Sequence, residues 1–246
     1  MSFKSLQIRY QTARSLPAPY SYFYTLTINT VAANAIQVDL AITYPGRDDI
    51  DDDELIAEGY TRDDDYAWSG RLPKAWWESL AALVRKTRLQ PVVEDEIEED
   101  DDFWAITIEA ENGNKTTGQP AKAEDWQYLM QELIQATYEA MGSERPFELI
   151  YLDLNNQQGE LELHLTASFV ERTVKITTLE SRREQSKLIS WSSLQHVMSQ
   201  VYNYDYDPDD AMLKRPKRDG QWLNMGTEEW YEISDYRALG KLFRGL

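Results

Sequence analysis

The sequence predicts an α+β fold with mostly antiparallel sheets, about four main helices and two similar halves. Short segments in which apolar and polar residues alternate recur along the 246-residue chain and indicate strands with one buried face. Four longer segments carry apolar residues at helical spacing. Because the same order of segments occurs twice, we expect two halves packed together as one globule.

The first strands are predicted near the N-terminus. After a short strand at 6–10, the alternating segments 22–28 and 36–42 predict an antiparallel pair with one apolar face. Two more strands are predicted after the following acidic stretch, at 55–60 and 66–68.

A helix is predicted next, because Pro73 fits the first turn of a helix, where its missing N–H costs nothing. The apolar residues of 76–84 form one face of this helix, which closes before Pro91.

A strand, a turn and a helix follow at 102–142. Residues 104–108 alternate as a strand does, and Asn112-Gly113 suits a tight hairpin turn. The helix begins with acidic residues at 124–125, and Gly142 stands where a helix C-cap is expected.

The second half repeats this pattern. Strands are predicted at 147–151, 161–165 and 174–176, with a polar turn at 155–159. Ser190 can cap a helix over 191–201. A strand around 222–225 and a last helix, from Ser234 through 239–243, complete the chain.

The two hairpins also share their spacing, since fourteen positions separate Tyr22 from Ile36 and Phe147 from Leu161. We expect an old duplication, with chance recurrence of a common β–α order as the alternative. An acidic insertion at 48–54 would explain why the first half is longer. The predicted domains are residues 1–143 and 144–246.

The net charge of −18 is concentrated in particular loops. Six acidic residues lie at 48–54, three at 63–65, eight at 94–102 and four at 205–210, which is 21 of the 43 in the chain. The run at 94–102 is too charged to fold by itself and is expected to be a loop or linker. Such charge repels nucleic acid and anionic membranes and favours basic proteins or cations.

The chain has no cysteine, which excludes disulfides, thiolate metal sites and a cysteine nucleophile. No apolar run has the length of a signal peptide core or a transmembrane helix. We therefore expect a cytoplasmic protein that binds no membrane.

The residues typical of catalysis and metal binding are sparse. His164 shares a face with Glu160 and Glu162, and His196 lies on the polar side of its helix, so both are expected at the surface. No glycine-rich phosphate loop and no Gly-x-Ser-x-Gly elbow occurs. We predict no catalytic residue, no cofactor and no metal site.

The acidic loop at 205–210 resembles a calcium loop only in its alternating aspartates. From Asp205, position six is Asp210 where glycine is needed, and position twelve is Pro216 where glutamate is needed. Weak, partly hydrated cation binding is the alternative to plain solvated charge.

Aromatic residues divide into two groups. Trp76, Trp77, Trp126 and Trp191 stand near helix starts with apolar neighbours three and four positions on, so core packing explains them. We expect Trp126 to pack on the strand at 104–108.

A tyrosine patch at 202–206 is harder to bury, because its rings alternate with polar residues beside an acidic loop. The predicted partner-binding residues are Tyr202, Tyr204, Tyr206, Asp205, Asp207, Asp209 and Asp210. The basic run at 214–218 is expected to be a counter-charge to this loop.

The predicted function is a non-catalytic acidic module that binds a basic protein, such as an inhibitor or immunity-type protein. The alternative is a small-molecule or carbohydrate-processing enzyme with a carboxylate-lined cleft between the halves. A buried carboxyl group with a raised pKa would favour the enzyme, and exposed acidic residues would favour the binding protein.

Overall fold

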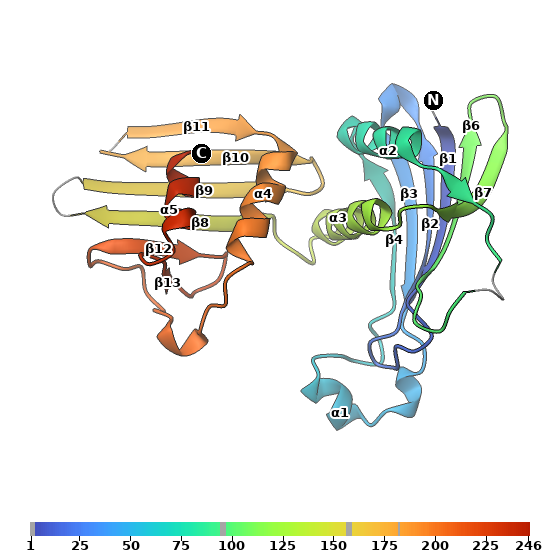
Figure 1. Cartoon of the computed structure of the whole chain (residues 1–246), viewed down its shortest axis with the longest axis horizontal. Coiled ribbons are helices and arrows are strands. Elements are labelled where there is room, and N and C mark those ends of the chain that lie inside the picture. Colours follow the sequence, from blue (N-terminus) through green and yellow to red (C-terminus); the bar gives the residue numbers. More distant parts are fainter. Residues whose placement is uncertain (1–2, 94–96, 156–158, 182) are drawn as a thin grey trace. The chain divides into compact units, whose positions relative to one another are not determined.

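A computed structural model of the protein describes residues 3–93, 97–155, 159–181 and 183–246 (Figure 1). The chain divides into two compact units, Met1–Thr137 and Tyr138–Leu246. Each unit contains one antiparallel sheet and its own helices, which confirms the predicted α+β class. Residues 94–96 of the acidic run and 156–158 of a predicted turn lie outside the described residues.

The first unit is built on a seven-stranded sheet in the order β4-β3-β2-β1-β6-β7-β5. Its strands are β1 (Phe3–Gln11), β2 (Phe23–Thr30), β3 (Ile36–Thr43), β4 (Tyr66–Leu72), β5 (Leu89–Gln90), β6 (Phe103–Ala110) and β7 (Lys115–Pro120). Its helices are α1 (Asp52–Ala57), α2 (Lys74–Lys86) and most of α3 (Glu124–Met141), whose residues from Tyr138 on fall in the second unit.

Alternation along the central strands places their apolar residues on one face of this sheet. Ile8 of β1, Leu26 of β2 and Val38 of β3 are fully buried or nearly so. The helices α2 and α3 cover this face (Figure 1). Trp76 of α2 and Trp126 of α3 have no exposed surface, so both helices contribute large rings to the core.

The expected strand at 55–60 is wrong, because these residues belong to α1 and the turn after it. The Asp51 side chain caps α1 by accepting a hydrogen bond from the Asp53 amide at 3.0 Å. Leu55 alone is buried in this helix, and Gly59 leaves it with a φ of +83°. Acidic residues in the first turn stabilise the helix start, which outweighs the short apolar pattern.

The predicted turn and cap of the strand–turn–helix segment are confirmed. Gly113, between β6 and β7, has a φ of +82°, and Gly142, just after α3, has a φ of +81°. Both values lie in the left-handed region that glycine adopts without steric cost.

The second unit is built on a six-stranded sheet in the order β11-β10-β9-β8-β12-β13. Its strands are β8 (Phe147–Asn155), β9 (Gly159–Ser168), β10 (Thr173–Glu180), β11 (Arg183–Ile189), β12 (Gly220–Asn224) and β13 (Tyr231–Glu232). Its helices are α4 (Trp191–Val201) and α5 (Arg237–Arg244), and Ser190 caps α4 as predicted.

Among the described residues, two apolar clusters hold the second unit together. The larger one lies between the sheet and its two helices, which cross the same face (Figure 1), and includes Tyr151, Val197 and Phe243. The smaller one contains Leu152 and Trp222, whose positions along their strands put them on the opposite face.

Both sheets share a strand order. Each places four consecutive strands in reverse order and adds two later strands beside the first of them, as β4-β3-β2-β1-β6-β7 and β11-β10-β9-β8-β12-β13. A helix follows the fourth strand in each unit, and another closes it. A duplication requires such a shared order, although the duplication and the domain boundary at 143–144 stay predictions.

No helix among the described residues has the length and apolar character needed to cross a membrane.

Candidate functional site

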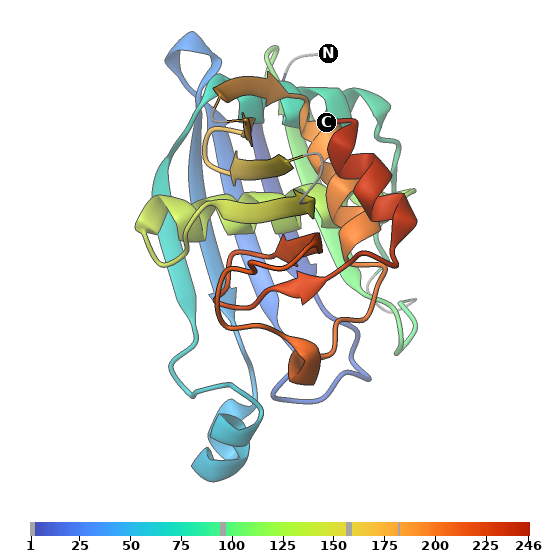
Figure 2. The same cartoon turned by 90° about the vertical axis from the view of Figure 1, so that its left-hand side faces the viewer.

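Two acidic segments of the first unit meet at one end of its sheet. A row of paired residues marks this end, running through Phe103, Gln11, Phe23 and Thr43. Residues 44–65, the acidic lobe, leave the sheet beyond Thr43 and return at β4. Residues 97–102, the acidic loop, lead into Phe103. Figures 1 and 2 show α1, within the lobe, beyond the ends of β3 and β4.

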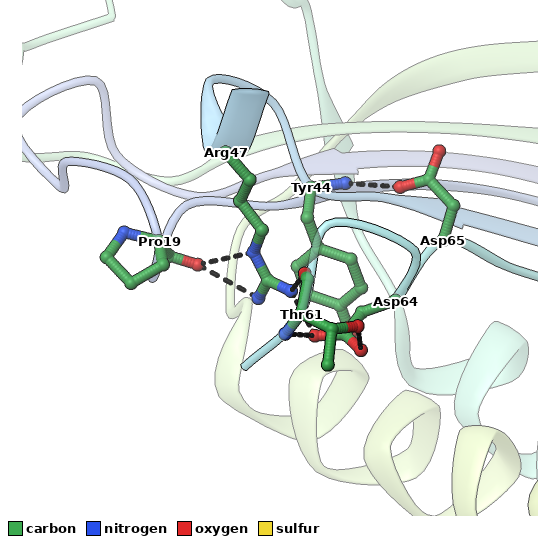
Figure 3. Close-up of polar contacts among 6 residues, drawn as sticks. All are labelled: Pro19, Tyr44, Arg47, Thr61, Asp64 and Asp65. Carbon is green, nitrogen blue, oxygen red and sulfur yellow. Dashed lines mark hydrogen bonds and ion pairs between the residues drawn. The ribbon is translucent and has the colours of Figure 1, made fainter. Parts of the chain in front are cut away.

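Arg47 is the centre of the acidic lobe, and its side chain is only 3% exposed. Figure 3 shows its guanidinium group among acceptors from two segments, the loop after β1 and residues 61–64. Nε and Nη2 donate to the Pro19 carbonyl at 3.2 and 3.0 Å. Nη1 donates to the Thr61 carbonyl at 3.1 Å and to the Asp64 carboxylate. One buried cation therefore joins both ends of the lobe to the loop after β1.

Two rings and a carboxylate complete the surroundings of Arg47. Its guanidinium carbon lies 4.0 Å from the centre of the Tyr44 ring and 4.6 Å from that of Tyr60. Asp64 also accepts from the Thr61 amide at 2.9 Å and the Thr61 hydroxyl at 2.6 Å. Burial alone would raise the pKa of Asp64, but the hydrogen bonds from Thr61 and Arg47 outweigh it and lower the pKa.

The other carboxylates of the lobe face solvent. All six acidic residues of 48–54 are exposed, as is Asp63. Arg62 contacts Asp52 at 2.5 Å and donates to the carbonyl groups of Asp48 and Ile50, both at 2.7 Å. The lobe therefore has a folded, cation-centred interior and a surface dominated by negative charge.

The acidic loop is fixed to the end of β1 and to the segment that follows it. Four hydrogen bonds join Tyr10 to Asp102 at 2.8 Å, Ala13 to Asp102 at 2.9 Å, Arg14 to Ile97 at 2.6 Å and Ser15 to Glu99 at 3.0 Å. Burial, with Tyr22 and Asp102 nearby, raises the pKa of the Tyr10 phenol, so it stays protonated and donates. Residues 97–102 are thus a loop within the first unit and not a linker between units.

A hollow of about 540 Å³ opens beside the acidic loop. Four exposed carboxylates line it, from Asp100, Asp101, Asp102 and Glu124. Its other walls include apolar surface from Pro91, Val93, Ile97, Trp104 and Pro120. The hollow is open and its lining is more polar than apolar, so it suits a charged group better than an apolar ligand. Its carboxylates favour cations.

A row of aromatic contacts connects the hollow with the acidic lobe. Ring centres are 4.7 Å apart for Trp104 and Tyr10, 5.5 Å for Tyr10 and Tyr22, and 6.0 Å for Tyr22 and Tyr44, which contacts Arg47. These rings place both acidic segments on a shared packed base. We call the lobe, the loop and the hollow together the acidic end.

The structure splits the tyrosine patch predicted at 202–206. Tyr202 is 57% exposed. Tyr204 stacks on Tyr236 with ring centres 4.5 Å apart, and the Tyr206 hydroxyl donates to the Val201 carbonyl at 2.9 Å. Because Tyr204 and Tyr206 are half-buried against the core of the second unit, only Tyr202 offers most of its ring to a partner.

The predicted aspartates of this loop, Asp205, Asp207, Asp209 and Asp210, are all exposed. Asp207 also has a local structural role, since its side chain accepts from the Asp209 amide at 3.0 Å and caps a short 3₁₀ turn.

The basic run at 214–218 was expected to neutralise this acidic loop. This expectation is wrong for Arg215 and Arg218, the two arginines of the run. Arg215 pairs with Glu160 and, at 2.6 Å, with Glu162 of β9. Arg218 pairs with Glu232 at 2.6 Å. These ion pairs attach the run to the sheet, because Glu160, Glu162 and Glu232 lie on its strands.

Both histidines are exposed, as predicted. His164 Nε2 lies 2.6 Å from Glu162 Oε1. Within the described parts of the chain, no group of three or more histidine, aspartate or glutamate side chains is arranged to hold a metal ion.

Neither Arg47 nor the hollow was recognised from the sequence. The acceptors of Arg47 are mainly backbone carbonyl groups from distant residues, which no sequence pattern marks. A signal for the hollow does exist, because Asp100–Asp102 lead directly into the strand that begins with Phe103-Trp104.

Comparisons with known proteins found no match to this chain among family models, curated proteins or solved structures.

Proposed function

We propose that the protein is a non-catalytic binding module whose acidic end holds a basic protein partner. The observation that carries this proposal is the meeting of two sequence-distant acidic segments beside a hollow with both carboxylate and apolar walls. Lysine and arginine fit such walls, because their aliphatic stems cover apolar surface while their charged ends meet carboxylates. An inhibitor or immunity-type role against a basic protein is consistent with this charge distribution.

The exposure of the carboxylates favours binding over catalysis. General acid chemistry needs a carboxyl group held protonated by a buried, apolar site. Asp100, Asp101, Asp102 and Glu124 are exposed to water instead, where carboxylates can attract a basic partner.

A second surface for a basic partner is proposed at Tyr202 and the four aspartates of 205–210. Exposed charge and one exposed ring support it. Tyr204 and Tyr206 would have an indirect role there. Their rings pack against the core and so position Tyr202.

Binding of a fluorescein-labelled decalysine peptide, followed by anisotropy, tests the proposal. We expect binding that weakens with salt, because screening over about 8 Å at physiological ionic strength reduces charge attraction. The double variant Asp100→Asn/Asp101→Asn should bind at least fivefold more weakly than the wild type.

The comparison variant is Asp205→Asn/Asp210→Asn, which removes the same charge from the second proposed surface. A loss below twofold in this comparison variant would support the hollow as the binding surface. A larger loss in the comparison variant than in the first variant would assign binding to the 205–210 loop. Absence of binding at low salt would overturn the proposal at both surfaces.

A further inference from the structure

Strands at the edge of a sheet expose unpaired backbone groups, and three of the four edge strands described here are protected. β5 and β13 are only two residues long. β11 is longer but carries exposed charges from Arg183, Glu184 and Lys187. Short length and charged side chains are the usual protection against pairing with another chain.

β4 lacks this protection. It has seven residues, of which Arg71 alone is charged, and pairs only with β3 among the described strands. One set of alternate backbone N–H and C=O groups along β4 therefore faces away from the sheet. An edge of this length is a ready template for one more strand.

An aromatic ring lies along this strand. Trp68 is half-buried and pairs with Leu40, so its side chain is on the buried face of the sheet. A Cβ atom at Gly70 would lie only 2.3 Å from the Trp68 indole, so the ring extends along the strand over Gly70. The ring offers apolar surface to a side chain on a neighbouring strand.

The acidic lobe adjoins the start of β4. Asp63 and Asp65 are exposed just before Tyr66, the first residue of the strand. Because strand residues advance by about 3.3 Å each, a segment paired along β4 reaches the lobe one or two residues beyond Tyr66. Basic residues there would meet the exposed carboxylates.

We propose that β4 accepts an extended segment of the basic partner as an added strand. This segment contributes an apolar side chain against Trp68 and lysine or arginine residues at its end beside the acidic lobe. The inference rests on the proposed function and specifies how the partner binds: backbone hydrogen bonds supply the pairing, and the lobe selects the charge.

The test uses synthetic peptides and the full chain. Two ten-residue peptides alternate valine and threonine and carry three lysines at one end. The lysines are N-terminal in one peptide and C-terminal in the other. Both are needed because the lobe determines which end of the added strand is charged, but not whether this strand runs parallel or antiparallel to β4. Matched peptides carry N-methyl groups on alternate residues, which preserves charge and removes the N–H groups needed for pairing. Amide exchange measured by NMR locates the bound peptide.

We expect one unmethylated peptide to bind at least tenfold more tightly than its methylated counterpart and to slow exchange at alternate amides of β4, with β11 unchanged. Equal binding of methylated and unmethylated peptides would overturn strand addition while leaving charge-driven binding at the acidic end intact. Protection at a strand other than β4 would also overturn it. If no peptide binds at low salt, both the inference and the proposed function are wrong.

Discussion

Arg47 shows how one residue organises a segment that would otherwise repel itself. The lobe around it carries exposed acidic residues that favour separation over compact folding. The buried guanidinium group counters this repulsion, because it joins Pro19, Thr61 and Asp64 and contacts two tyrosine rings. The charge pattern of 48–54 was visible in the sequence, but the cation that stabilises it was not, since its acceptors are remote backbone atoms.

Arg47→Met should lower the free energy of unfolding of the first unit by about 2–4 kcal/mol, because it leaves buried acceptors and Asp64 without their donor. Urea denaturation measures the loss. Arg62→Met is the matched control, because Arg62 is 38% exposed, and its loss should be much smaller than that of Arg47→Met. Equal losses in the two variants would show that Arg47 does not organise the lobe.

Asp64 makes the stability of the lobe depend on pH. Since its pKa is lowered from 3.8 in the folded protein, its stabilisation is fully present above that value and is lost as the pH falls through the folded pKa. The difference in unfolding free energy between wild type and Asp64→Asn should therefore be constant from pH 5 to 7 and shrink below about pH 4. Asp49→Asn, which changes an exposed carboxylate, is the control; a gap that does not narrow in acid would contradict the assignment.

Individual elements were predictable where one face is buried. The strands β2, β3 and β9 and the helices α2 to α4 follow their apolar periods, because burial of one face dictates the pattern. β11 was missed for the opposite reason, since all its residues before Ile189 are exposed and no alternation marks it. α1 was mistaken for a strand because a six-residue segment is too short to distinguish a helical from a strand pattern of apolar residues. Capping by Asp51 favours the helix.

Trp126 is the residue of α3 whose substitution best tests how this helix packs on the core. Its ring is fully buried and its Nε1 donates to Thr87 Oγ1 at 2.9 Å. Trp126→Ala should cost about 3–5 kcal/mol in a urea melt, because it removes a buried ring and leaves a cavity. Trp126→Phe, which keeps most of the apolar contact, should cost less than half as much. Gln131→Ala, on the exposed side of the helix, should change stability by under about 0.5 kcal/mol; a Trp126→Ala loss of that size would mean that the ring is not a core residue.

The last turn of α3 belongs to the second unit through Glu139. Its carboxylate accepts from the Ser168 hydroxyl at 2.6 Å and the Phe169 amide at 2.7 Å, in the turn after β9. Hydrogen bonds to a charged group contribute about 1.5–3 kcal/mol. In Glu139→Gln, exchange of the Phe169 amide should therefore be about ten- to hundredfold faster by NMR. Glu171→Gln changes an exposed carboxylate near the same turn and should leave this rate unchanged; equal rates in both variants would contradict the role of Glu139.

At the scale of the whole molecule, the sequence predicts the recurring order of elements. It does not predict which acidic stretches meet in space. The two halves follow from the order of periodic segments, which each sheet retains. The acidic end depends on strand register, because pairing of Phe103 with Gln11 and of Phe23 with Thr43 brings 97–102 and 44–65 to one end. Register is fixed by long-range pairing, so the sequence alone shows separate acidic stretches but not their meeting.

The acidic lobe should be dispensable for folding if it is an insertion into a repeated unit. In the second unit the equivalent strands close tightly, since Glu180 of β10 pairs with Arg183 of β11. Replacing residues 44–64 by Asn-Gly would join Thr43 to Asp65 through a two-residue hairpin turn. The shorter connection returns about 2 kcal/mol of loop-closure entropy, which offsets the lost contacts between Arg47 and Pro19.

We therefore expect this shortened chain to unfold cooperatively, with a free energy of unfolding within about 2 kcal/mol of the wild type. Its amide NMR shifts in β1, β2 and β6 should be retained, while binding of basic peptides weakens because the lobe's carboxylates are gone. Replacing the lobe with an uncharged glycine–serine segment of equal length is the control, and it separates lost charge from altered loop length. If the shortened chain loses its cooperative transition, the lobe is part of the first unit's core and the difference between the halves is not an insertion.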